Sequence, residues 1–395
     1  MALALGLVSG VVSARALGPA LRGEFVATQT LAAMAAVALT LGMTQAVVTY
    51  RGDDVDLAAP LLLQAGLAIV LGTGLFTALA VLGTQLWLNP IGVAGGAALT
   101  AGTLLASNSA GLAQRRGKMT REFQWVRLLP QAVGVLAAVL LWAAGVRNSD
   151  IWLLVIGLGI FVPSALLMVG LLDSLGALTR FPIRPPAREL VREAAGSFVT
   201  VLGSQVIYRL DSLFVAIWLP TAKVAFYAVA VGAGTACAAI GQAVGMVTFS
   251  RLRNIREPSH QKAIIRRGTA LALGLTSAVS LPLAWIAPIA IRIVYGSAFV
   301  PAVEAARILI LAAIPLSADY LLLHALLSLG AARRAFRVQL VAGLLTIGLL
   351  AASTSTGRLV LVALVSLAVY SISAALLFTL AMRGTNRPQA RAAVS

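Results

Sequence analysis

Two charged residues, Arg209 and Asp211, lie inside the apolar segment VIYRLDSLFVAIW (206–218). On a membrane-spanning helix, insertion scales assign each such charge a cost of about 2.5–3.5 kcal/mol, so ionisable residues at this depth face a wet cavity or a polar partner. A guanidinium binds phosphate oxygens well, and a carboxylate can bind a proton or a sodium ion. These residue types suggest a cavity that admits an anionic cargo and a coupling ion.

The helix expected at 195–219 is polar over about half its circumference when each residue is advanced by 100°. Arg209 and Asp211 lie near opposite edges of that sector, and residues two apart do not face each other on a helix, so we do not expect one tight ion pair. We interpret the sector as cavity lining; satisfaction of each charge by another helix is the open alternative. The sector comprises Ser197, Thr200, Ser204, Gln205, Tyr208, Arg209, Asp211 and Ser212.

A second apolar segment, PLSADYLLLHALLSLG (315–330), carries Asp319 and His324, the other candidates for ion coupling. Histidine titrates near physiological pH, which would suit proton coupling, whereas a hydrogen bond to a neighbouring group is the simpler role for His324. Asp319 has an equally simple alternative, in which it accepts hydrogen bonds from backbone or arginine groups.

Three further polar residues are expected at the predicted cavity: Arg15, Gln29 and Gln45. Arg15 could attract an anionic headgroup or anchor the helix end at the interface, and the two glutamines could line the cavity or join helices by hydrogen bonds. Cys237 is the only cysteine, and no Cys/His cluster indicates a metal site. We therefore expect no metal and no cofactor.

The elements that must position these residues are membrane helices. The chain is 60% hydrophobic and 11% charged, with a mean hydropathy of +0.95. Apolar runs of about 20 residues recur along it, long enough to cross a hydrocarbon core of about 30 Å. The pattern predicts an all-α polytopic membrane protein with twelve helices, at about 2–18, 25–50, 57–86, 90–113, 127–146, 151–175, 195–219, 224–250, 268–294, 301–329, 336–356 and 358–382.

The net charge of +17 follows this helix pattern. Of the 30 Lys and Arg residues, 22 fall in the even-numbered connections and the C-terminal tail, and 7 fall in or beside the odd-numbered connections. The positive-inside rule then predicts that both termini are cytoplasmic. Because the cations occur in small groups between apolar runs, we expect no nucleic-acid partner.

The longest polar break, RFPIRPPARELVR, contains prolines that cannot continue a helix. It predicts an N-terminal six-helix lobe at 1–178, a cytoplasmic linker at 179–194, a C-terminal six-helix lobe at 195–383 and a tail at 384–395. A weak internal repeat supports this division, since LGPALRGEFVA after the first helix is similar to LPTAKVAFYAVA after the seventh.

Three stretches resemble the polysaccharide flippases, a family of the superfamily that also holds multidrug exporters and peptidoglycan-precursor flippases. They are ARALGPALRGEFVATQTLAAMAAVALTLGMTQAVVTY for helices 1 and 2, RLDSLFVAIWLPTAKVAFYAVAV for helices 7 and 8, and APIAIRIVYGSAFVPAVEAARILILAAIPLSADYLLLHALLSLGAARRA for helices 9 and 10. The resemblance implies a MATE-like fold of two lobes with pseudo-twofold symmetry and a central cavity between helices 1, 2, 7 and 8. Family members begin with a leader and a fuller first helix, so the resemblance also implies that this sequence starts inside that helix.

The resemblance further implies a bacterial cell-membrane transporter that flips a polyprenyl-diphosphate-linked oligosaccharide from the cytoplasmic to the outer leaflet by alternating access. An ion gradient or the membrane potential would drive it, with membrane lipids and polysaccharide-assembly proteins as its partners. A multidrug or cation antiporter of the same superfamily is the alternative. An enzyme is not expected, because the short outward connections pair no carboxylates for glycosyl chemistry and the chain has no GxxxxGKS motif.

Overall fold

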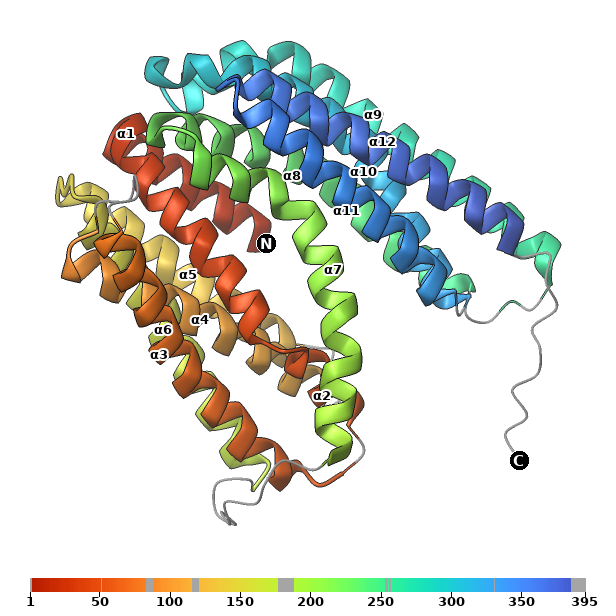
Figure 1. Ribbon diagram of the computed structural model, residues 1–395, viewed down its shortest axis with the longest axis horizontal. Helices are drawn as coiled ribbons and strands as arrows, with labels where there is room; N and C mark the ends of the chain where they lie inside the picture. The colour runs from red at the N-terminus through yellow and green to blue at the C-terminus, as the bar shows by residue number, and fades with distance from the viewer. Residues whose placement is uncertain are drawn as a thin grey trace. The chain divides into compact units, whose positions relative to one another are not determined.

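The computed structural model describes residues 2–50, 52–82, 88–115, 121–176, 188–252, 255, 257–329 and 331–384, and the regular structure in these ranges is helical throughout (Figure 1). Ten of the helices are long and apolar enough to cross a membrane. The prediction of an all-α polytopic membrane fold is therefore confirmed. The elements are α1 (Ala2–Leu39), α2 (Met43–Thr49), η1 (Asp54–Leu57), α3 (Ala58–Val81), α4 (Pro90–Arg115), α5 (Arg121–Ala143), α6 (Ser149–Ser174), α7 (Arg188–Trp218), α8 (Thr221–Leu252), α9 (Pro258–Val294), η2 (Ser297–Ala302), α10 (Val303–Ser328), α11 (Ala332–Thr354) and α12 (Leu359–Gly384).

The first two predicted helices differ from the structure in their boundaries. The turn expected after residue 18 is a kink at a single residue, Gly18, whose φ of 68° and ψ of 179° are not helical, and Pro19 follows it inside α1. A positive φ is readily adopted only by glycine, so the chain changes direction there and the helix resumes at once. The red ribbon of α1 shows this change of direction (Figure 1).

A second break separates α1 from α2, which the sequence had suggested were one helix. Leu41 and Gly42 both have positive φ, at 47° and 75°, and the last carbonyls of α1 lose their helical partners. The buried Gln64 of α3 donates its Nε2 to Leu39 O, the last carbonyl of α1, at 2.7 Å and to Thr40 O in the turn at 2.6 Å. A side-chain amide therefore supplies a donor where the backbone ladder of α1 ends.

Gln64 is itself held by a side chain of α4. Asn108 donates its Nδ2 to Gln64 Oε1 at 2.8 Å and accepts from Thr44 Oγ1 of α2 at 2.9 Å. Asn108 is fully buried, so the chain of amides joins α2, α3 and α4 in the interior. Polar residues at membrane depth can line a cavity or join helices by hydrogen bonds, and these residues join helices.

The structure falls into two compact units, Met1–Phe226 and Tyr227–Ser395. In the first unit α4 contacts α1, α2, α3, α5 and α6, while α7 contacts α1 and α2. The small residues of α4 permit this crowding, since a Cβ added at Gly95 would lie 2.6 Å from the backbone carbon of Leu153 in α6. The unit therefore surrounds α4.

In the second unit α10 contacts α9, α11 and α12. It also lies against α8 through the motif GQAVG (241–245), where a Cβ at Gly241 would lie 2.3 Å from Ser317 Cα and one at Gly245 would lie 3.2 Å from Leu321 Cα. This GxxxG spacing allows the two backbones to approach closely.

The predicted lobes follow the internal repeat of the sequence, whereas the compact units follow contacts, which group α7 with α1 and α2. The lobe, linker and tail boundaries therefore stay predictions, and residues 177–187 and 385–395 lie outside the described part of the chain.

Candidate functional site

Arg209 and Asp211, the two charged residues inside the apolar part of the seventh predicted helix, have different environments on α7. Asp211 is buried, with 5% of its surface exposed, and among its interactions Oδ1 accepts from the backbone N–H of Ser212 at 2.6 Å and from its hydroxyl at 3.3 Å. Arg209 is exposed and Tyr208 is half-buried, while the side chain of Gln205 lies outside the described part of the structure. A rotation of about 200° between residues two apart accounts for the contrast.

The other predicted cavity residues in the first unit are also exposed. Arg15 and Gln29 lie on α1 and Gln45 lies on α2. Both helices pack against α7, so three neighbouring helices present exposed polar side chains, Arg209 included. We refer to Arg15, Gln29, Gln45 and Arg209 as the polar set.

The surfaces of α3 and of the middle of α6 are mainly apolar, whereas α5 exposes Gln124, Arg127 and Gln131. The large exposed residues on α3 and on the middle of α6 are aliphatic, as expected for a surface in contact with lipid. The polar set on α1, α2 and α7 thus contrasts with α3 and α6, although α1 and α7 also expose apolar residues near their ends, such as Val8 and Ile217. The aliphatic residues of α3 and α6 are Leu63, Leu67, Ile69, Val70, Leu71, Leu75, Leu158, Val162, Leu166 and Val169.

The remaining ion-coupling candidates lie in the second unit, on α10. Asp319 is 1% exposed and accepts from the Ser373 hydroxyl of α12 at 2.5 Å and from Gln339 Nε2 of α11 at 3.1 Å. His324 is half-buried, and its Nδ1 lies 2.8 Å from Tyr320 O one turn earlier, a contact that needs the proton on Nδ1. Asp319 thus joins three helices, whereas the contact of His324 with Tyr320 is local to its own helix.

Two carboxylates that the sequence did not single out lie at the start of α6. Ser149 Oγ donates to Glu24 Oε2 of α1 at 2.7 Å, and the neighbouring Asp150 is 8% exposed. A Cβ at Gly92 of α4 would lie 2.1 Å from Asp150 Oδ1, so a larger residue there would displace the Asp150 carboxylate. The sequence predicted that Glu24 lies in a connection between helices, so its contact with Ser149 was not expected.

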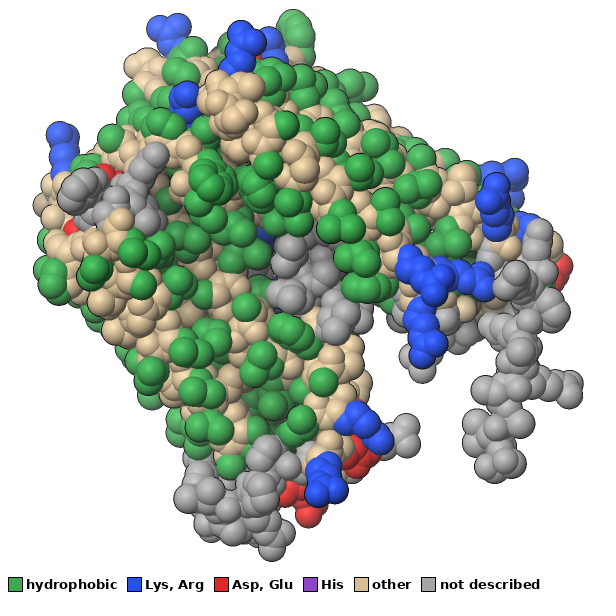
Figure 2. Space-filling view, in the orientation of Figure 1, with side chains coloured by type: hydrophobic (Ala, Val, Ile, Leu, Met, Phe, Trp, Pro, Cys, Tyr) green, Lys and Arg blue, Asp and Glu red, His purple; other side chains and the backbone are tan. Residues whose placement is uncertain are grey.

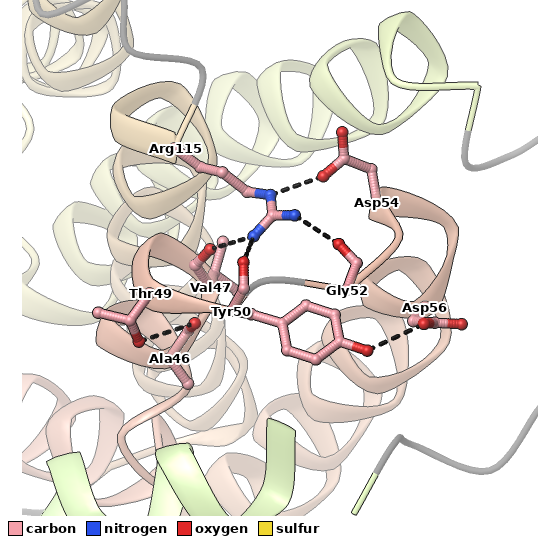
Figure 3. A network of polar contacts seen from close by, with 8 residues as sticks. All are labelled: Ala46, Val47, Thr49, Tyr50, Gly52, Asp54, Asp56 and Arg115. Atoms are coloured by element: carbon pink, nitrogen blue, oxygen red, sulfur yellow. Dashed lines mark hydrogen bonds and ion pairs between the residues drawn. The ribbon is translucent and has the colours of Figure 1, made fainter. Parts of the chain in front are cut away.

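Arg115, the last residue of α4, is the centre of a polar network in the first unit (Figure 3). Its Nε donates to Asp54 Oδ1 at 2.6 Å, Nη2 donates to Gly52 O at 2.8 Å, and Nη1 donates to the carbonyls of Val47 and Tyr50. The guanidinium therefore caps the carbonyl end of α2.

The same network changes the acidity of Tyr50 and reaches α7. The Tyr50 hydroxyl donates to Asp56 Oδ2 at 2.9 Å, and burial together with this hydrogen bond raises the pKa of Tyr50 to about 12. Thr49 Oγ1 donates to Glu193 Oε2 of α7 at 2.8 Å. Hydrogen bonds thus link α4 and α7 to the end of α2, and α4 also to the segment that follows it.

Comparison with solved structures identifies the fold. A structure of the lipid II flippase MurJ in an inward closed conformation has a TM-score of 0.73, at 15% identity over 96% of this chain and 85% of that one. An inward-facing multidrug resistance MATE family transporter of the MOP superfamily has a TM-score of 0.70, at 13% identity over 97% and 94%. A MOP superfamily transporter from Pyrococcus furiosus has a TM-score of 0.54, at 12% identity over 96% and 91%.

No protein-family model and no curated protein matches the sequence. At 12–15% identity the solved structures bear on architecture alone, yet each covers almost the whole chain. The expected MATE-like architecture is therefore confirmed: this chain has the fold of the MOP superfamily, shared by MurJ and the MATE transporters.

Proposed function

We propose that this chain is a membrane transporter that flips a polyprenyl-diphosphate-linked oligosaccharide from the cytoplasmic to the outer leaflet of the bacterial cell membrane by alternating access. The observation that carries the proposal is the exposed Arg209 on α7, a helix that packs against α1 and α2, which expose Arg15, Gln29 and Gln45. The similarity in fold to a lipid II flippase supports a lipid-linked cargo.

Arg209 has the chemistry and the depth that a diphosphate site requires. It lies nine residues before Trp218 at the end of α7, about 14 Å along the helix axis. An arginine exposed to hydrocarbon at that depth is costly, so its exposure favours contact with water and an anion. Its planar fork can make two hydrogen bonds to phosphate oxygens, which a lysine cannot reproduce.

Transport needs an energy source, and we propose ion coupling through the intramembrane acids. Asp211, Asp319 and His324 are the candidates, and Asp319 is buried where it accepts hydrogen bonds from Ser373 and Gln339. A carboxylate at such a position can take up and release a proton or a small cation. An ion gradient or the membrane potential would then drive the cycle, and no catalytic step by this chain is required.

The decisive experiment is deletion of the gene followed by isolation of polyprenyl-linked intermediates from each leaflet. We expect one lipid-linked glycan to accumulate on the inner leaflet and the corresponding surface polysaccharide to be lost. Re-expression of the wild-type chain should restore both, which controls for effects on neighbouring genes. Unchanged glycan and unchanged intermediates would exclude this cargo.

The second candidate function is a multidrug or cation antiporter, favoured by the fold similarity to MATE transporters and by the buried acids Asp211 and Asp319. Such a protein should export a fluorescent organic cation from loaded cells against its gradient. Export that depends on Asp319, together with a normal surface glycan after deletion, would select this function over the flippase.

A further inference from the structure

One end of the second unit carries a dense group of cations, which we call the basic end. They lie at the end of α8, the start of α9, the start of α11 and the end of α12, and the buried cluster around Leu252, Ile265, Ala335 and Ala381 joins these helix ends. Figure 2 shows Lys and Arg side chains gathered over the start of α11. The group is Arg251, Lys262, Arg266, Arg267, Arg333, Arg334, Arg337 and Arg383.

Acidic residues do not balance this charge. The only acids between residues 227 and 395 are Glu257, Glu304 and Asp319. Asp319 is buried, and Glu304 lies in the first turn of α10, at the other end of that helix. Glu257 is bonded locally, to the Ser259 hydroxyl and to His260 Nδ1 at 3.3 Å, and these contacts lower its pKa.

The end of the first unit formed by η1 and the start of α7 has a different charge pattern. There Arg115 pairs with Asp54, and Glu189 and Glu193 share the first turns of α7 with two arginines. Figure 2 shows acidic and basic side chains mixed at the start of α7. The positive-inside rule requires only a modest excess of cations at one side of the membrane. The basic end has almost no acidic residues, and this larger excess favours a bound anion there.

The basic end lies directly beside exposed apolar residues on the same helix faces. On α9, Arg267, Leu271, Leu275 and Val279 follow one another at intervals of four, and all are exposed. Residues four apart lie on one face of a helix. An exposed guanidinium is thus followed by three turns of exposed aliphatic side chains.

The start of α11 repeats this arrangement. Arg337, Val341 and Leu345 are spaced four apart and exposed, and Arg333 and Arg334 extend the cationic part by one turn. A water-soluble partner would leave the aliphatic stripe uncovered. A lipid matches both parts, because its phosphate would meet the arginines while its acyl chains lie along the stripe.

We propose that the basic end of the second unit binds an anionic phospholipid of the surrounding bilayer. Arg333, Arg334 and Arg337 on α11 hold the phosphate, and Arg266 and Arg267 on α9 form a second contact group. Seven of the eight cations are arginine, the residue whose fork geometry matches phosphate oxygens. This site is separate from Arg209 and does not depend on the cargo.

The test is a lipid titration of the full chain in detergent, with bound lipids counted by native mass spectrometry. Phosphatidylglycerol should bind at least tenfold more tightly than phosphatidylcholine with the same acyl chains. The triple variant Arg333→Gln/Arg334→Gln/Arg337→Gln should lose most of this preference, since each cation at a membrane surface contributes about fivefold in affinity. The matched variant Arg188→Gln/Arg192→Gln, which removes exposed arginines from α7, should keep it.

Two further measurements keep the proposal falsifiable. If the triple variant does not insert, raising the salt from about 0.1 to about 0.5 M should weaken binding of phosphatidylglycerol to the wild-type chain, because screening strengthens with ionic strength. Equal binding of the two lipids, unchanged binding by the triple variant or insensitivity to salt would overturn the proposal. Preferential displacement of phosphatidylglycerol by a polyprenyl diphosphate would overturn it as well, by assigning the surface to a transport cargo.

Discussion

Arg307 of α10 donates its Nε to the carbonyl of Ala284 in α9 at 3.1 Å. That carbonyl lies four residues before Pro288, which has no N–H to offer it. The exposed arginine therefore replaces a backbone hydrogen bond that proline removes, and it joins two helices of the second unit in doing so.

This relationship predicts a coupled effect on stability. Arg307→Met should lower the free energy of unfolding by about 1–3 kcal/mol, the cost of leaving a buried carbonyl unsatisfied. In a Pro288→Ala background the backbone can satisfy Ala284 O, so the same substitution should cost less. Thermal unfolding in detergent would measure both, with Arg292→Met, another exposed arginine at the end of α9, as the control. Equal costs in the two backgrounds would contradict the account.

Gln64 should be essential to the break between α1 and α2. Gln64→Leu removes the donor for Leu39 O and Thr40 O and the acceptor for Asn108, so we expect a loss of about 1–3 kcal/mol. Gln29→Leu changes the same residue type at an exposed position of α1 and should have little effect on thermal stability. Similar melting temperatures for the two variants would show that the amide network contributes nothing.

The high pKa of Tyr50 predicts alkaline sensitivity in the first unit. An ordinary tyrosine ionises near pH 10, whereas Tyr50 keeps its proton to about pH 12 in the folded chain. The folded pKa is raised, so its stabilising contribution is complete below pH 10 and is lost as the pH rises toward 12. Ultraviolet titration of wild-type and Tyr50→Phe protein should differ by one late-ionising tyrosine. A difference centred at pH 10 would refute the assignment.

Arg209 is expected to determine transport rather than folding. Arg209→Ala should insert normally but reduce restoration of surface glycan at least tenfold, because the phosphate contact is lost. Arg209→Lys should retain part of the activity, since it keeps the charge but not the fork. Arg358→Ala, at an exposed position between α11 and α12, controls for the general loss of a cation. Full complementation by Arg209→Ala would remove Arg209 from the mechanism.

Substitutions at Asp319 and at its partner Ser373 should distinguish a role of Asp319 in ion coupling from a purely structural role. Asp319→Asn preserves the side-chain shape but cannot be deprotonated, so we expect an inserted protein whose gradient-driven transport falls at least tenfold. Ser373→Ala removes one hydrogen bond to Asp319 and should cost about 1 kcal/mol of stability with most transport retained. Transport in membrane vesicles with an imposed pH or sodium gradient would distinguish the two. Normal transport by the asparagine variant would reduce Asp319 to a structural acceptor.

Several features of the fold could be predicted because they are local properties of the chain. The length of an apolar run and its bounding polar residues depend on neighbours in sequence, and the predicted helices at 90–113 and 301–329 match Pro90–Arg115 and Val303–Ser328 within two residues at each end. The two breaks in the first helices were harder to predict. Pro19 and Gly42 are common residue types in membrane helices, and only the observed dihedral angles distinguish a kink, a break and an uninterrupted helix.

The sequence by itself determined the membrane-helical class, the approximate helix bounds and the presence of charges inside apolar runs, since composition and periodicity fix these without reference to distant residues. Only the tertiary structure decided which of those charges are buried. Asp319 meets Gln339 and Ser373, residues 20 and 54 positions later, and Arg115 closes an end of α2 more than 60 positions earlier. Such partners depend on which helices pack together, a choice made by side-chain shape at contacts that no local pattern encodes.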